Sequence, residues 1–186
     1  MRLFVAIWPP PEIIARLRLL DRPARPNVRW TTPAQWHVTL SFLGDTADLG
    51  RARHGLAQVG LAWEERTLAA AGPATACFGR RVLYVPVHGL LALAKLVQAA
   101  LPPSIEGRQG QGISPSFTGH ITLARARRAG DRSGRIADLS GAPFSATWPV
   151  ERLTLVASTL TGDGPLYSIV GSVMPPHATH GNDRCR

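Results

Sequence analysis

Two four-residue segments combine a histidine and a threonine at the same spacing. Residues 37–40 read His-Val-Thr-Leu, and residues 120–123 read His-Ile-Thr-Leu. Side chains along a β-strand alternate between its two faces, so the histidine and the threonine of each segment would share one face. We therefore predict that four side chains line a common cleft: His37, Thr39, His120 and Thr122.

The same alternation makes two further predictions. It assigns Phe42 to the aliphatic face of the first strand, together with Val38 and Leu40. It assigns Arg125 to the face opposite His120, unless the second strand ends or bulges before that residue.

Two histidines and two threonines in one cleft suit the cleavage of a phosphodiester. Histidine titrates near neutral pH, so one imidazole can take a proton from water while the other protonates the leaving oxygen. Threonine hydroxyls can donate hydrogen bonds to the non-bridging oxygens as charge builds up on them. No spacing typical of metal ligands accompanies either segment, so we expect a metal-independent reaction. Two strands whose histidines and threonines only face solvent, or bond each other, would show the same spacing.

The elements predicted around these segments alternate irregularly. Residues with strand patterns are 2–8, 28–30, 37–42, 119–125, 144–158 and 165–174, with two or three further strands inside 66–87. Helices are expected from Pro9–Pro11 onward and over 46–59, 90–101 and 132–139. Few βαβ units of the right length can be formed, which favours an α+β fold with antiparallel pairing. Residues 104–116 are predicted to form a loop, and those from Pro175 onward a disordered tail.

Length and charge limit the possible classes of protein. The chain has 186 residues, of which 45% are hydrophobic and 18% charged, enough for one domain or two small lobes. It has no apolar run of membrane-spanning length, and we expect a cytoplasmic monomer. The net charge of +9 indicates a polyanionic partner. Only Lys95 among the 21 basic residues is a lysine, so a general bias toward arginine explains the charge equally well.

Several other residues are of types that could have chemical roles. Cys77 and Cys185 cannot form a disulfide framework, and His54 and His88 are expected at the surface. A metal site made of His177, His180 and Cys185 is disfavoured, because these residues lie in the predicted tail. Four aromatic residues either stack on a base or pack in the core: Phe4, Trp8, Trp30 and Tyr167.

The chain resembles the 2H phosphoesterase superfamily and, within it, the RNA 2′,3′-cyclic phosphodiesterases, also called 2′-5′ RNA ligases. The resemblance runs from Met1 to about Val173. The two segments 36–44 and 117–125 carry it most specifically. Other matching stretches are residues 2–7, 28–30, 81–85, 153–158 and 164–167.

This resemblance implies one domain over residues 1–174, built of two lobes with the active cleft between them. Each lobe would carry an antiparallel sheet with helices outside. The implied reaction opens a 2′,3′-cyclic phosphate at the end of an RNA or nucleotide to a 2′-phosphate without a cofactor. His37 would donate a proton to the leaving 3′ oxygen, and His120 would accept one from water. Three further residues would bind the phosphate: Thr39, Thr122 and Arg125.

One departure and three alternatives remain. The family usually has a proline where this chain has Gly119, and glycine loosens the backbone just before His120. The same histidines could instead join a cyclic phosphate to a 5′-hydroxyl. A non-catalytic RNA-binding module and an interaction protein without any nucleic-acid role are the other two readings.

Overall fold

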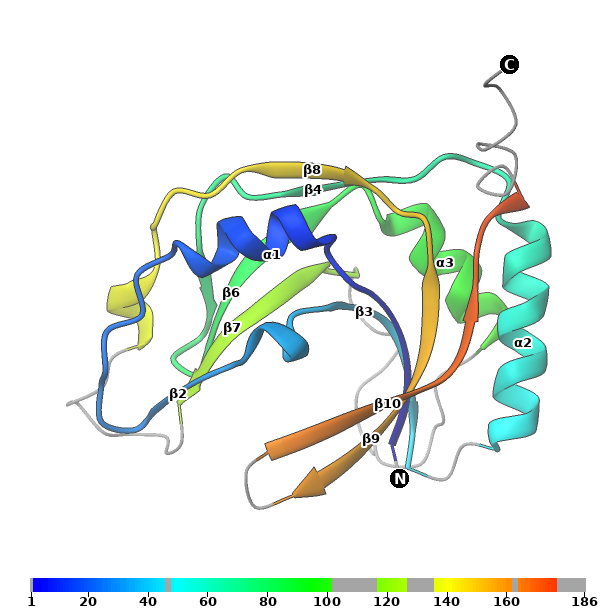
Figure 1. The fold of residues 1–186 in the computed structure, drawn as a ribbon, viewed down its shortest axis with the longest axis horizontal. Coiled ribbons are helices and arrows are strands. Elements are labelled where there is room, and N and C mark those ends of the chain that lie inside the picture. Colours follow the sequence, from blue (N-terminus) through cyan, green and yellow to red (C-terminus); the bar gives the residue numbers. More distant parts are fainter. Residues whose placement is uncertain (1, 46–47, 102–116, 127–135, 162–163, 177–186) are drawn as a thin grey trace.

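A curled antiparallel sheet forms the scaffold of the protein (Figure 1). The computed structural model describes residues 2–45, 48–101, 117–126, 136–161 and 164–176. Every strand pair in these ranges is antiparallel. The strands are β1 (Arg2–Ile7), β2 (Val28–Trp30), β3 (Val38–Gly44), β4 (Leu68–Ala71), β5 (Ala76–Phe78), β6 (Val82–His88), β7 (His120–Ala126), β8 (Ala146–Pro149), β9 (Leu153–Thr161) and β10 (Gly164–Val173).

The helices lie outside this sheet. They are α1 (Pro11–Arg18), α2 (Leu49–Ala62) and α3 (Leu91–Ala100), with short 3-10 helices at Pro33–Gln35 and Ile136–Leu139. Proline at the first position starts α1, and the Asp48 carboxylate caps α2 by accepting from the Arg51 amide at 2.7 Å. α2 packs on α3 and β10, and α3 packs on β3. The predicted α+β class with antiparallel pairing is therefore confirmed.

The sheet consists of two groups of strands that meet at one residue pair. Its order is β10-β9-β1-β3-β7-β6-β4-β8, with β2 added to β7 and β5 to β6. β3 and β7 pair only through Val38 and Ile121, which are both fully buried. Each of these residues directly follows one of the two predicted histidines. In an antiparallel register this pair places His37 opposite Thr122, and Thr39 opposite His120.

Both histidine strands contain the same irregularity. Ala6 and Val5 of β1 pair with Thr39 and Ser41, so Leu40 is an extra residue in β3. Tyr84 and Leu83 of β6 pair with Thr122 and Ala124, which leaves Leu123 as the extra residue in β7. Such a bulge reverses the alternation of the residues that follow it.

The two bulges decide the positions of Phe42 and Arg125. Phe42 is 61% exposed and lines the pocket that contains His37, so its predicted place on the aliphatic face is wrong. Arg125 reaches the pocket that contains His120, because the bulge at Leu123 precedes it and turns its side chain to the His120 face, as expected for a strand that bulges before Arg125. The alternation rule holds only as far as the first extra residue of each strand.

The strand predicted over residues 144–158 is also corrected. It is divided into β8 and β9, which lie toward opposite ends of the sheet. Alternate residues of β8 are buried, whereas the first five residues of β9 are all buried between β1 and β10. The chain crosses the molecule between these strands, and local alternation contains no signal for such a crossing.

Other predicted boundaries move by a few residues. The helix predicted over 46–59 is α2, and the 3-10 helix at Ile136–Leu139 lies within the helix predicted over 132–139. The loop at 104–116 and nearly all of the tail from Pro175 fall outside the described residues. No helix in the described ranges is long and apolar enough to cross a membrane.

Candidate active site

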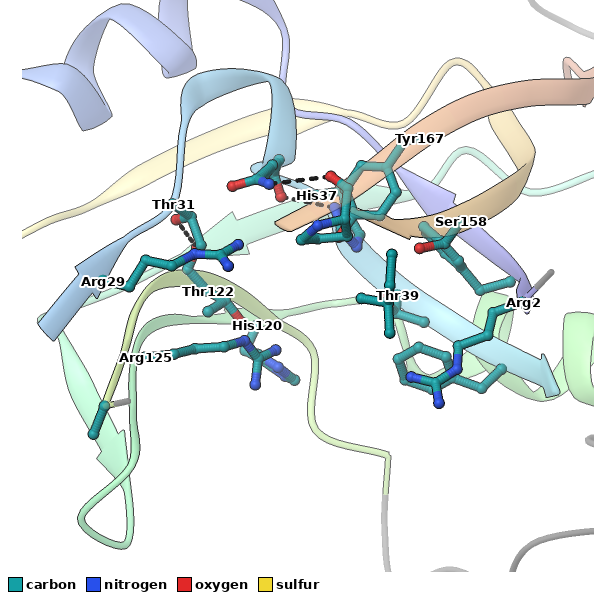
Figure 2. Close-up of a pocket in the computed structure, with 16 residues that line it drawn as sticks. Arg2, Arg29, Thr31, His37, Thr39, His120, Thr122, Arg125, Ser158 and Tyr167 are labelled. Atoms are coloured by element: carbon teal, nitrogen blue, oxygen red, sulfur yellow. Dashed lines mark hydrogen bonds between the residues drawn. The ribbon is translucent and has the colours of Figure 1, made fainter. Parts of the chain in front are cut away.

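A cavity of about 530 Å³ lies where the two groups of strands meet. All five residues predicted for the site line this cavity: His37, Thr39, His120, Thr122 and Arg125. The wall opposite β7 includes Ser158 and Tyr167 from the β9–β10 hairpin, as Figure 2 shows. The cavity is larger than a single phosphate requires and falls in the usual range for small-molecule sites.

Matching hydrogen bonds hold both imidazoles. Nδ1 of His37 lies 2.8 Å from the carbonyl oxygen of Gln35, and Nδ1 of His120 lies 2.9 Å from that of Thr118. A carbonyl oxygen only accepts hydrogen bonds, so each Nδ1 carries a proton. Nε2 is therefore the nitrogen of each ring that can exchange a proton with a substrate.

Aromatic rings fix the orientation of the two imidazoles. The His37 ring centroid lies 5.1 Å from Phe4, 5.2 Å from Trp8 and 5.2 Å from Tyr167. His120 makes edge-to-face contacts with Phe78 at 4.9 Å and Tyr84 at 5.5 Å. Of the four aromatic residues considered for base stacking, Phe4 and Tyr167 line the cavity. Trp30 packs against the core and donates its indole N–H to the Pro23 carbonyl.

Burial keeps both histidines neutral. It lowers the pKa of His37 from 6.5 to about 4, against the opposing effect of the Gln35 carbonyl, and the charges of His120 and Arg125 lower it further. The pKa of His120 is also lowered, again mainly by burial and then by Arg125. A bound phosphate would oppose these effects, because a nearby anion favours the charged form of histidine.

The cavity carries positive charge. Among the described residues that line it there is no aspartate or glutamate, whereas Arg2, Arg29 and Arg125 are present. Arg2 is paired with Asp45 at 2.8 Å. The described residues contain no group of three histidine, cysteine, aspartate or glutamate side chains that could hold a metal ion.

Gly119 brings the backbone close to β6. A Cβ at this position would lie 2.4 Å from the carbonyl oxygen of Val87, and the Gly119 carbonyl accepts from the Val87 amide at 2.8 Å. Proline or alanine would therefore force one of these backbones to move. The glycine does not displace His120, which lines the cavity as predicted.

Several lining residues were missing from the sequence-based site. Thr31 donates its hydroxyl to the carbonyl oxygens of Thr122 at 2.7 Å and Leu123 at 2.8 Å, which ties β2 to the bulge of β7. Gln35 donates to the carbonyl of Pro165 at 3.3 Å and so connects the His37 segment to the β9–β10 hairpin. Phe42 and Arg125 each lie five residues after one of the two histidines, and this equal spacing is a signal for Phe42 in the sequence. Ser158 has no such signal.

The histidines and the cysteine that were not predicted for the site lie outside the cavity, where the structure describes them. His54 and His88 are exposed and lie outside the cavity. Cys77 is a free, half-buried thiol whose pKa is raised by burial. His177, His180 and Cys185 lie outside the described residues.

The chain is similar to several known proteins. A model of the 2′-5′ RNA ligase superfamily matches residues 5–161. The chain is 31% identical over 181 residues to an RNA 2′,3′-cyclic phosphodiesterase of Thermus thermophilus, covering 91% of this chain and 88% of that protein. The crystal structure of TT0787 from the same organism superposes with a TM-score of 0.71 at 28% identity, covering 94% of this chain and 97% of that one.

A more distant structure shares the fold. LigT of E. coli, crystallised with 3′-AMP, has a TM-score of 0.66 at 23% identity, covering 94% of this chain and 98% of that one. The family match spans most of the chain and includes both histidine segments. The chain belongs to the 2′-5′ RNA ligase superfamily.

Proposed function

We propose that this protein hydrolyses the 2′,3′-cyclic phosphate at an RNA end to a 2′-phosphate, with His37 and His120 as proton donor and acceptor. The observation that carries the proposal is the matched placement of the two imidazoles. Both are held through Nδ1 and both line one cavity, on either side of the Val38–Ile121 pair. The similarity to a relative named RNA 2′,3′-cyclic phosphodiesterase supports the choice of substrate.

The proposed reaction is a direct displacement at phosphorus. Nε2 of His120 takes a proton from water as the water oxygen attacks and a new P–O bond forms. The bond from phosphorus to the 3′ oxygen breaks, and Nε2 of His37 protonates that oxygen. Thr39, Thr122 and Arg125 donate to the non-bridging oxygens as negative charge grows on them. Proton exchange with solvent then restores both imidazoles.

The lowered pKa of His37 gives the substrate phosphate a role in protonating this residue. With its pKa at about 4, His37 carries a proton at neutral pH only when an anion lies beside it. A charge on His120 also lowers the pKa of His37, so the protonation of the two rings is coupled. The choice of His37 as the donor and His120 as the acceptor rests on the family resemblance. We retain the assignment from the family, since the substrate phosphate acts on both rings.

Hydrolysis of a 2′,3′-cyclic nucleotide in the presence of EDTA tests the function. We expect release of the 2′-phosphate at an undiminished rate, because imidazoles replace the metal ions of other phosphodiesterases. A chelator-sensitive activity that added divalent metal restores would contradict this mechanism. Binding of the cyclic nucleotide without any product would instead indicate a non-catalytic RNA-binding module.

The reverse reaction uses the same groups. Joining a cyclic phosphate to a 5′-hydroxyl would require His37 and His120 to exchange roles. Water is present at far higher concentration than any 5′-hydroxyl, so hydrolysis is the expected net direction. Incubation with a 5′-hydroxyl oligonucleotide, followed by analysis for a joined product, measures the ratio of the two reactions.

The remaining parts of the proposal concern organisation. We take residues 1–174 as one functional domain of two lobes, acting as a monomer in the cytoplasm. The cavity draws residues from both strand groups, which favours a single functional unit. Light scattering at the concentration of the assay would measure the oligomeric state, and a dimer that is required for activity would overturn this part.

A further inference from the structure

Two arginines lie side by side at one end of the cavity. β2 pairs with β7 so that Arg29 is directly opposite Arg125, and both line the cavity. Like charges in directly opposite positions of a sheet repel each other. Within the described part of the chain, neither guanidinium has a salt bridge or hydrogen-bond partner. This end of the cavity therefore holds two positive charges without a counter-charge from the described residues.

The β9–β10 hairpin leaves space for the Arg29 side chain, which comes from β2. Gly164, at the start of β10, has a φ of +118°, and a Cβ there would lie 2.2 Å from Nη2 of Arg29. The missing side chain lets the guanidinium lie against the hairpin backbone. Figure 2 shows Arg29 and Arg125 extending from the same side of the pocket, with His37 and Tyr167 beyond them.

Tyr167 adds a third polar group at this end. Burial raises the pKa of its hydroxyl, and the charges of Arg125 and Arg29 act in the opposite direction. Both guanidinium groups are thus close enough to the hydroxyl to influence its ionisation. Two cations and a hydroxyl around one space are the groups that bind a phosphate oxygen.

The other end of the cavity differs in charge. Arg2 lies there, but Asp45 neutralises it through a 2.8 Å ion pair. The reacting phosphate is accounted for by the two histidines and two threonines at the junction of β3 and β7, together with Arg125, which leaves Arg29 without an anion. A second anion of the same substrate would therefore be attracted to the end with Arg29 and Arg125. In an RNA strand, the next anion is the phosphodiester on the 5′ side of the terminal nucleotide.

We propose that Arg29, together with Tyr167, binds the phosphodiester that joins the terminal nucleotide to the rest of the RNA, while Arg125 beside it binds the cyclic phosphate. This assignment rests on the proposed function and specifies its substrate. The preferred substrate is then an RNA end, and a free cyclic mononucleotide lacks one of the two bound phosphates. Arg29 makes no direct contribution to the chemical step.

The test compares two substrates that differ in this phosphate. One is a 2′,3′-cyclic mononucleotide with a 5′-hydroxyl, and the other is a dinucleotide with the same cyclic terminal nucleotide. A hydrogen-bonded ion pair to phosphate predicts that the dinucleotide has a kcat/KM higher by on the order of 10- to 100-fold. Arg29→Gln should remove most of this preference through KM and leave the kcat/KM of the mononucleotide within about twofold.

Three variants complete the test. Arg29→Lys keeps the charge and should restore part of the dinucleotide preference. Arg51→Gln removes an exposed arginine of α2, outside the cavity lining, and should behave as the wild type. Gly164→Ala should displace the guanidinium and lower the preference without removing Arg29. Thermal unfolding of each variant identifies any that lose activity because they fail to fold.

Two outcomes would overturn the second phosphate site. One is a wild-type protein that does not distinguish the two substrates. The other is an equal loss for both substrates in Arg29→Gln, which would assign Arg29 to the cyclic phosphate or to the hairpin. If the wild type hydrolyses neither substrate, the proposed function fails. Calorimetry with 2′-phosphate forms of the mononucleotide and the dinucleotide then still tests the second site.

Discussion

The two histidine segments share a frame and differ in what they add to it. Each histidine bonds through Nδ1 to the carbonyl oxygen two residues earlier, and each strand bulges at the leucine three residues later. Five residues after the histidine, the first strand presents Phe42 and the second presents Arg125. The repeated features hold two imidazoles alike, whereas the differing residue places an aromatic ring on the β3 side of the cavity and a guanidinium on the β7 side.

The aromatic neighbours of the two imidazole rings also differ. Three aromatic rings pack around His37, and burial lowers its pKa to about 4. Two aromatic rings meet His120, whose pKa is lowered mainly by burial and further by Arg125, which also acts on His37. Burial therefore lowers the pKa of both residues, although the rings that surround them differ.

The largest expected effect separates the roles of the histidines. His37→Ala and His120→Ala should each reduce hydrolysis of a cyclic nucleotide by on the order of 10²- to 10⁴-fold. With a nitrophenyl phosphodiester, whose leaving group needs no proton, the loss in His37→Ala should be much smaller. Kinetic measurements on both substrates give the comparison directly.

The pattern of rescue then assigns the acid and the base. Rescue of His120→Ala and not of His37→Ala would mean that the acid and the base are exchanged. Rescue of neither variant would mean that both imidazoles bind the phosphate and do not move protons. The pH profile alone cannot decide this, because its two limbs belong to the coupled pair.

A smaller effect is expected at the position where the two halves differ. Arg125→Gln should lower kcat/KM by on the order of 10- to 100-fold, because a charge-assisted contact to the phosphate is lost. Phe42→Ala, at the matching position of β3, should cost less and leave the salt dependence unchanged. Steady-state kinetics at two salt concentrations test both variants. Equal losses and equal salt dependence would mean that the charge of Arg125 has no role in phosphate binding.

Burial of the His37 ring predicts that the stability of the protein depends on pH. Between the folded pKa of about 4 and the ordinary value of 6.5, the unfolded chain binds a proton at His37 that the folded protein does not. The free energy of unfolding should therefore increase as the pH rises through this window, by roughly 3 kcal/mol from this residue. His37→Gln should flatten that rise.

Urea unfolding at intervals from pH 4 to pH 7 measures this dependence. His54→Gln, on the exposed side of α2, is the control variant and should keep the slope of the wild type. An unchanged slope in His37→Gln would show that His37 is more accessible to water in solution than its aromatic surroundings indicate. His120→Gln provides the corresponding measurement for the second half.

The smallest effect concerns the residues that precede the two histidines. Trp36 is fully buried and donates to Thr31 at 3.0 Å, whereas Gly119 leaves room for the carbonyl of Val87. Gly119→Ala should destabilise the protein by about 1–3 kcal/mol, because the added Cβ meets backbone. Thermal unfolding measures this loss. Gly79→Ala is not a suitable control, because the positive φ of Gly79 would add backbone strain to the variant. Gly50→Ala near the start of α2, where the added Cβ would meet only a side-chain oxygen, is the better one.

The sequence determined the class of fold and predicted which residues line the cavity. Histidine, threonine and aliphatic residues at alternate positions of two strands placed His37, Thr39, His120 and Thr122 on one side of each strand. This succeeded because the alternation is local and depends only on the geometry of an extended chain. The roles of the two histidines, which the sequence proposed through the family resemblance, stay predictions.

Only the tertiary structure decided how the two segments meet and where their alternation ends. The Val38–Ile121 pair joins strands that are far apart in the chain, and the bulges at Leu40 and Leu123 depend on the strands that pair beside them. A single extra residue moves every following side chain to the other face, which is why Phe42 was misplaced. The placement of Arg29 beside Arg125 and against Gly164 likewise requires three strands to come together, and no local pattern in the sequence contains that information.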